Sequence, residues 1–265
     1  MNHEHEPVLP ADRHQLLRGH LMSEISRKPR STTRRYGWAA VPVLAGALAL
    51  TVVLNTGGAA PTASAASVVL DRAAAAAAAK PRQEVKDSQY VYVQRQDPEV
   101  KAELWLPVDG KRPALLDDSR YGRRELTPLD EPASVNNPNY RYVATLPTDP
   151  AALLALIKAQ TEGQGQSPEH AAFKAINRLV AEQIATPEVS AALFRAAGLI
   201  PGAVVHEDVT DGLGRHGVGV ALPDGKATVE WVFDRDSYEY LGARWGQGAD
   251  AVVRRAVVDK AGDRP

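Results

Sequence analysis

The sequence predicts an α+β protein: one N-terminal transmembrane helix, then a large curved antiparallel sheet, a half-barrel, with about three helices packed on its concave face. Three observations in the 265-residue chain predict this fold class. An uncharged apolar stretch follows a basic tail, strand patterns occur both early and late in the remainder, and three helix patterns lie between them. Strands on either side of a run of helices are typical of α+β domains.

Charge and composition exclude several classes of site. The formal net charge is -1, whereas nucleic-acid binders take much of their affinity from a basic excess, so no nucleic-acid partner is expected. The chain contains no cysteine. Disulfides, thiolate nucleophiles and cysteine-ligated zinc sites are therefore excluded.

Residues 36–56 form the predicted transmembrane helix. No charged residue occurs between Arg35 and Asp71. As a helix, the strongly apolar part would measure about 25 Å, and its uncharged flanks extend it toward the roughly 30 Å of a hydrocarbon layer. The lipid bilayer is thus an expected partner. The core of this predicted span comprises Trp38, Val41, Leu44, Leu48, Leu50, Val53 and Leu54.

The basic tail, residues 1–35, predicts the direction of insertion. Lys and Arg beside a span stay on the cytoplasmic side, so the tail is predicted in the cytoplasm and the C-terminal domain outside the cell membrane. A cleaved export signal is the alternative, because Arg34-Arg35 resembles a twin-arginine pair and Ala63-Ser64-Ala65 a cleavage site. Within the tail, Leu9 to Ser26 has helical spacing. That helix would lie on anionic lipid or bind a cytoplasmic regulator such as a sigma factor.

Residues 57–88 are predicted as a flexible exit followed by an Ala-rich helix. Small, polar and Gly-bearing residues favour flexibility at the start of this segment. The alanine run after Arg72 then favours helix until Pro81 stops it. This helix is expected to lie across the sheet or to act as a spacer.

Residues 89–262 are predicted as the exported α+β domain. Its first strand patterns, with alternating apolar and polar residues, cover residues 89–96, 101–107 and 114–126. Turn signals at Asp97-Pro98 and Asp109-Gly110 separate them. A Pro- and Asn-rich loop, Asp130 to Tyr140, follows and is long enough to lie over a sheet edge or a cleft.

Three helix patterns come next, and each begins with the same device. Asp149-Pro150, Ser167-Pro168 and Thr186-Pro187 each place a capping side chain before a proline of the first turn. Apolar residues then recur every three and four positions. Each helix therefore has one face to bury.

Five further strand patterns complete the domain, at residues 203–211, 217–223, 226–233, 237–245 and 251–261. Asp211-Gly212 and Asp224-Gly225 predict tight hairpins and an antiparallel meander. Residues 212–217 match the spelling G-x-G-x-x-G of dinucleotide sites. That site needs a helix after the glycines, whereas a strand follows here, so the match predicts only a hairpin.

No catalytic motif is visible. His206-Glu207-Asp208 is the densest titratable cluster, and strand alternation sends Glu207 to the face opposite His206 and Asp208. Glu230 with Asp234, or Asp117 with Asp118, could be paired catalytic carboxylates, but their spacing is equally typical of ordinary surface charge. We therefore predict a non-enzymatic protein with no catalytic, cofactor-binding or metal-binding residue.

Aromatic residues predict either a groove between sheet and helices or ordinary core packing. An open groove would suit a lipid-like or protein ligand. Its candidate lining comprises Tyr92, Trp105, Phe173, Phe194, Trp231 and Tyr240.

Several stretches together resemble a family of uncharacterised actinobacterial single-pass membrane proteins. They include LPADRHQLL near the N-terminus, LPTDPAALLALI (Leu146 to Ile157) and IPGAVVHEDVTDGLGRHGVGVAL (Ile200 to Leu222). The resemblance implies the topology above and, through an association with extracytoplasmic-function sigma factors, a regulatory role; it implies no activity. The predicted architecture is also similar to the lipoprotein-carrier and periplasmic sigma-regulator fold, whose members bind acyl chains or partner proteins in a groove.

The sequence leaves three functions open. The first is a membrane-anchored extracytoplasmic domain that binds or senses a lipid-like or protein ligand. The second is an anti-sigma-like transcription regulator acting through the tail. The third, an exported hydrolase, requires His206 or His170 to lie within hydrogen-bond reach of a carboxylate in a cleft.

Overall fold

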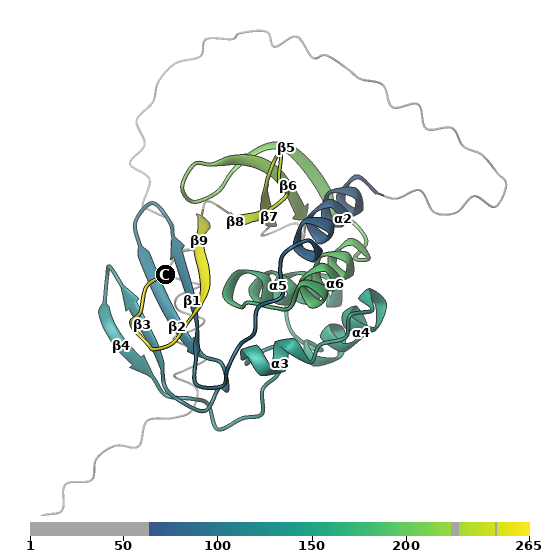
Figure 1. Ribbon diagram of the computed structural model, residues 1–265. Helices are drawn as coiled ribbons and strands as arrows, with labels where there is room; N and C mark the ends of the chain where they lie inside the picture. The colour runs from purple at the N-terminus through teal and green to yellow at the C-terminus, as the bar shows by residue number, and fades with distance from the viewer. Residues whose placement is uncertain (1–63, 224–227, 247) are drawn as a thin grey trace, which may run out of the picture.

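The computed structural model describes residues 64–223, 228–246 and 248–265 (Figure 1). The helices are α2 (Ala65–Ala78), α3 (Tyr140–Ala144), α4 (Pro150–Gln160), α5 (Pro168–Glu182) and α6 (Pro187–Gly198). The strands are β1 (Tyr90–Gln96), β2 (Lys101–Pro107), β3 (Ala114–Asp118), β4 (Gly122–Leu126), β5 (Val204–Thr210), β6 (His216–Leu222), β7 (Val229–Asp234), β8 (Tyr240–Trp245) and β9 (Gly248–Val258).

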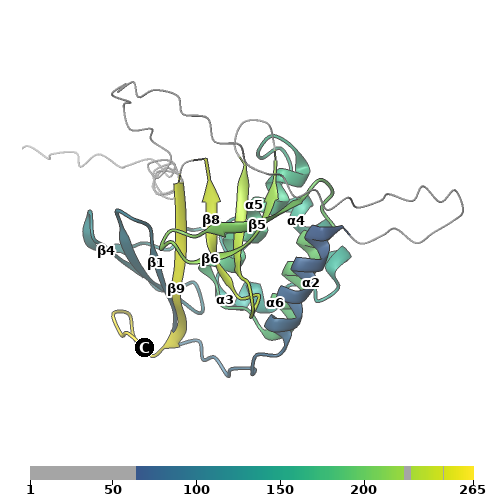
Figure 2. The same cartoon turned by 90° about the horizontal axis from the view of Figure 1, so that it is seen from above.

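All nine strands join one antiparallel sheet in the order β4-β3-β2-β1-β9-β8-β7-β6-β5. Two meanders, β1 to β4 and β5 to β9, meet where the first strand pairs with the last, in a register that begins with Tyr90 opposite Val258. The predicted α+β class with a large antiparallel sheet is confirmed. The sheet curves around the helices, which lie on one of its faces (Figures 1 and 2).

The proline-preceded caps form as the sequence predicts. The side chains of Asp149, Ser167 and Thr186 accept hydrogen bonds from the backbone N–H group of the third residue of α4, α5 and α6, respectively. Each helix carries proline in its first turn, where no intrahelical N–H partner is lost. The three helices therefore begin at the predicted residues.

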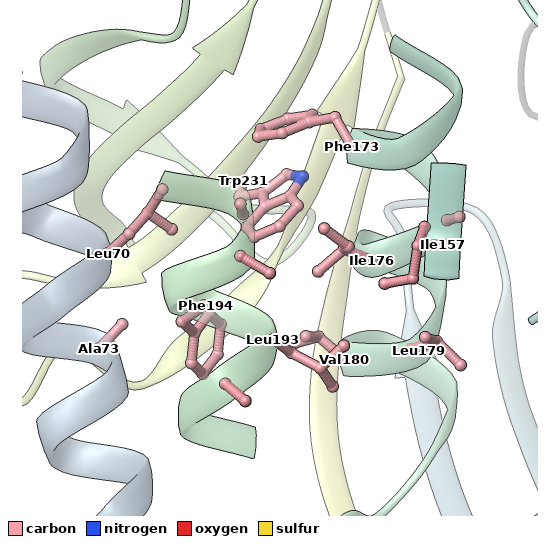
Figure 3. Packing of buried hydrophobic residues seen from close by; sticks show 14 of the residues in the cluster. Leu70, Ala73, Ile157, Phe173, Ile176, Leu179, Val180, Leu193, Phe194 and Trp231 are labelled. Carbon is pink, nitrogen blue, oxygen red and sulfur yellow. The ribbon is translucent and has the colours of Figure 1, made fainter. Parts of the chain in front are cut away.

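The main core fills the space between the helices and the inner face of β6 to β9. Trp231 of β7 is fully buried and stacks on Phe173 of α5, with ring centroids 4.3 Å apart (Figure 3). The Ala-rich α2 packs along α6 and buries Leu70 and Ala73 in the same core. Small side chains allow this approach: a Cβ at Gly198 of α6 would lie 3.6 Å from the Cα of Ser67. The folded unit therefore includes the Ala-rich helix.

The membrane part of the predicted fold class requires correction. Among the described residues, no helix is long and apolar enough to cross a membrane; α2, for example, has 14 residues, fewer than the ~20 that a span needs. The fold class becomes α+β without a membrane-spanning helix among its described elements, and the prediction of a single-pass membrane protein is corrected with it. The predicted span lies outside the described residues, together with Trp38, Val41, Leu44, Leu48, Leu50, Val53 and Leu54.

Candidate ligand-binding site

The six aromatic residues of the predicted groove are all buried. Four of them, Phe173, Phe194, Trp231 and Tyr240, belong to the core between helices and sheet. There Tyr240 lies edge-on to Trp231 and donates its hydroxyl hydrogen bond to Asn177 at 2.8 Å. Side chains thus fill the space between helices and sheet, which corresponds to the core-packing alternative for these four residues.

The other two, Tyr92 and Trp105, lie on the opposite face of the sheet, where the C-terminal segment covers them. The Trp105 indole N–H donates to the carbonyl of Asp263 at 2.6 Å. Arg264 forms a bidentate ion pair with buried Glu103, and both N···O distances are 2.8 Å. The Tyr92 hydroxyl donates to the same carboxylate at 2.6 Å. These contacts fix residues 263–264 against β1 and β2.

The ion pair sets the protonation of this cluster. Hydrogen bonds from Arg264, and a further one from Tyr92, lower the pKa of Glu103 to about 2 despite the opposing effect of burial. Burial and the neighbouring Glu103 raise the pKa of Tyr92. Glu103 therefore stays ionised, and Tyr92 protonated, through the neutral range.

Replacing Arg264 should make the stability of the protein less dependent on acid pH. Because the folded pKa of Glu103 is depressed, its contribution is complete above the unfolded pKa of about 4.3 and disappears as pH falls toward 2. We expect Arg264→Gln to lower the free energy of unfolding at pH 7, because buried Glu103 stays ionised and loses its charged partner. Urea unfolding should show this deficit shrinking between pH 5 and pH 2.

Arg264→Lys is the control for charge alone, and it should lose less than Arg264→Gln because an ammonium still faces Glu103. A deficit that stays constant from pH 7 to pH 2 would contradict the assignment of the effect to Glu103.

An open space lies instead beside strands β1 to β4, which we call the wing. Leu106, Leu116 and Leu126 come from three neighbouring strands and, by the pairing register, point to the same inner face. The segment 127–139 crosses over this face. Between them lies a slot of about 120 Å³. Its apolar lining includes Leu106, Ala114, Leu116, Leu126, Pro128 and Leu129, and its polar lining comprises Arg112, Arg124, Thr127, Glu131, Asn137 and Asn139.

The segment 127–139 is held in place by the helices. The backbone N–H of Val135 donates to Gln160 Oε1 of α4 at 2.8 Å, and Arg178 of α5 donates to the carbonyl of Val135 at 2.8 Å. Gln183 donates to the carbonyl of Pro138 at 3.4 Å. The Pro- and Asn-rich loop, predicted to lie over a sheet edge or a cleft, lines the hollows beside the wing.

Two arginines line the slot, and both are engaged by the protein itself. Arg124 pairs with buried Asp118 at 2.9 Å. Arg112 donates to the backbone carbonyls of residues 87–89 and lies over the ring of Tyr90. A wider hollow of about 590 Å³ adjoins the slot, and its polar lining comprises Asp109, Lys111, Asp130, Glu131 and Asn139.

The titratable cluster singled out in the sequence lies elsewhere, on β5, where a register shift between His206 and Val209 breaks the predicted alternation, so that His206 and Asp208 do not share one face. His206 Nδ1 lies 2.5 Å from Glu230 Oε1, and His216 Nδ1 lies 2.9 Å from Asp208 Oδ1. Gly219 makes the first pair possible, because a Cβ there would lie 2.5 Å from Glu230 Oε1. His206 has the carboxylate that the hydrolase hypothesis requires, but its side chain is 52% exposed and lines neither hollow described above.

The remaining candidates do not form a site. Asp117 and Asp118 face opposite sides of β3 and pair with different arginines. His170 is buried in α5. Within the described residues, no group of three or more His, Asp or Glu side chains could hold a metal ion. The tail, residues 1–35, on which the anti-sigma-like hypothesis rests, lies outside the described residues.

The slot residues were not singled out from the sequence. The available signal was the alternation that sends Leu104 and Leu106 to one face and Trp105 to the other, followed by a long Pro-rich segment after β4. No family model, curated protein or solved structure matches the chain. The resemblance to actinobacterial membrane proteins and the similarity to lipoprotein carriers therefore stay predictions.

Proposed function

We propose that this protein is a non-enzymatic binding module that captures a protein ligand through the wing slot. The observation that carries the proposal is the slot itself, an apolar hollow between the inner face of β2 to β4 and the segment 127–139. Apolar pockets that accept one anchoring side chain are where protein interfaces concentrate their binding energy.

The size of the slot favours a protein ligand over a lipid-like one. Pockets for drug-sized ligands measure about 300–1,000 Å³, whereas the slot measures about 120 Å³. The adjoining hollow of about 590 Å³ is in that range, but the charged side chains of Asp109, Lys111, Asp130 and Glu131 line it, which does not suit an acyl chain. The space between helices and sheet, which would suit an acyl chain, contains the stacked rings of Phe173 and Trp231. A single leucine or similar side chain, worth about 1.5–3 kcal/mol when fully buried, matches the slot better.

The chemistry of the lining supports a binding role. The slot floor is formed by aliphatic side chains, and Arg112 and Arg124 are committed to partners within the domain. Neither hollow has a histidine, serine or cysteine in its lining. The lining therefore offers apolar contact and a polar rim, and its hydroxyl and amine groups, those of Thr127 and Lys111, have no histidine beside them in either hollow.

The proposal can be tested with the smallest ligand that carries the anchor. N-acetyl-leucinamide, titrated into the full chain labelled with ¹³C at leucine methyls, should shift the methyl signals of Leu106, Leu116 and Leu126 saturably. N-acetyl-glycinamide should not. Ala114→Phe, which places a ring in the slot, should abolish the shifts, whereas Val253→Phe at an exposed position of β9 should not.

Thermal melts of both variants establish that they remain folded. Leucine-dependent shifts that are absent, or that persist unchanged in folded Ala114→Phe, would exclude the slot as the ligand site.

A further inference from the structure

The sheet edge beside the slot is available for pairing. β4 is the terminal strand, and within the described chain it pairs only with β3, from Ala114 opposite Leu126 to Asp118 opposite Gly122. Every second residue of such an edge strand directs its backbone N–H and C=O groups away from the sheet. These groups form a template for one more strand.

The slot lies where an added strand would place its side chains. Leu126 and Arg124 of β4 line the slot and face the inner side of the wing. Successive side chains of a strand alternate between the two faces. A strand laid along β4 would therefore direct alternate side chains to the inner face, beside the mouth of the slot.

The charge around this mouth favours one kind of ligand. Arg123 and Arg124, the cations of β4 itself, pair with Asp117 at 3.3 Å and Asp118 at 2.9 Å. Asp130 and Glu131 follow β4 by a few residues, are exposed, and form no ion pair with the described part of the chain within 4.0 Å. Among the residues that line the open hollow, Lys111 is their only cationic neighbour. Asp130 and Glu131, which we call the acidic rim, are therefore unpaired carboxylates that a basic side chain would complement.

We infer that the ligand is an extended, basic segment of a partner protein that pairs with β4 as a tenth strand. One apolar side chain enters the slot, and a lysine or arginine two residues away on the same face meets Asp130 and Glu131. This inference rests on the proposed function and specifies its ligand. Main-chain hydrogen bonds then supply affinity while the slot and the acidic rim supply specificity, the usual division in strand addition.

The test uses the heptapeptide acetyl-Thr-Lys-Thr-Leu-Thr-Lys-Thr-amide and the full-length protein. Two N-methylated forms, modified at the odd or at the even positions, separate the two edges of the peptide strand. Because only one edge faces β4, one N-methylated form should bind about tenfold more weakly while the other binds like the parent. Replacing both lysines with glutamate should weaken binding several-fold, and Asp130→Asn with Glu131→Gln should remove that difference.

The outcomes separate the two proposals. If leucine methyls of the slot respond to the peptide but both N-methylated forms bind like the parent, strand addition is overturned and the binding module stands. Equal affinity for the lysine and glutamate peptides would overturn the role of the acidic rim. If neither the peptide nor N-acetyl-leucinamide shifts the slot methyls, the proposed function itself fails.

Discussion

Trp231→Ala should destabilise the domain by about 3–5 kcal/mol, the range for removing a large aromatic side chain from a core. Trp231 has no exposed surface, stacks on Phe173 at 4.3 Å, and lies against Phe233 and Tyr240. Its removal leaves a cavity. The neighbouring rings belong to α5, β7 and β8, and these packed elements cannot all move to fill it. Denaturant unfolding followed by circular dichroism measures the loss, which is a large fraction of the ~5–15 kcal/mol typical of a domain.

Two variants serve as references for this effect. Trp231→Phe retains a ring against Phe173 and should lose less than the alanine variant. Leu199→Ala removes a side chain that is 53% exposed at the end of α6, and should change the free energy of unfolding by less than about 0.5 kcal/mol. A loss of only about 1 kcal/mol in Trp231→Ala would be incompatible with a ring packed at the centre of the core.

Arg95→Met should lower the free energy of unfolding by a comparable ~3–5 kcal/mol, because it leaves two carboxylates without the guanidinium that both pair with. Arg95 of β1 pairs with Glu182 of α5 at 3.2 Å and with Asp250 of β9. Asp250 is 5% exposed in its side chain and also accepts the backbone N–H of Ala243 at 3.0 Å. The interaction joins the wing to the helices and to the other meander. Denaturant unfolding at pH 7 gives the loss.

An exposed ion pair of similar chemistry provides the matched control. Arg82 pairs with Glu188 at 2.9 Å, but the two side chains are 65% and 50% exposed. Arg82→Met should therefore cost less than about 1 kcal/mol. Similar losses in Arg95→Met and Arg82→Met would show that burial of the Arg95 network contributes nothing beyond a surface pair.

Elements were predictable from the sequence where the signal is local. The cap and proline pairs at Asp149, Ser167 and Thr186 specify helix starts with a few neighbouring residues, and the structure has helices there. Alternation in QYVYVQRQ and KAELWLP likewise specifies strands with opposite faces. Such signals depend on backbone geometry over a single turn or strand.

The central pairing of the sheet could not be predicted in the same way. β1 and β9 are brought together by hydrogen bonds between residues as distant as Tyr90 and Val258, and no local pattern selects this partner. The role of the aromatic residues was undecided for a similar reason. Tyr92 and Trp231 are both strand aromatics, yet they belong to clusters on opposite faces of the sheet.

The candidate site was hidden from the sequence because no single segment contains it. Leu106, Leu116 and Leu126 are unremarkable strand leucines until the register aligns them across three strands. The segment 127–139 lines the slot because Gln160 and Arg178, from two later helices, form hydrogen bonds with it. The local sequence therefore predicted a loop over an edge or a cleft, and only the tertiary pairing determines which residues it faces.

The pairing of the first described strand with the last has a consequence for biosynthesis. The ribosome synthesises the chain from the N-terminus, so β1 cannot pair with β9 until almost all of the domain has been made. The wing can close its hairpins early, but the continuous sheet is a late, long-range event, and contacts of this kind slow folding. We expect the nascent wing to expose the β1 edge during that interval, which makes this edge the place where a chaperone or a second nascent copy would first compete with β9.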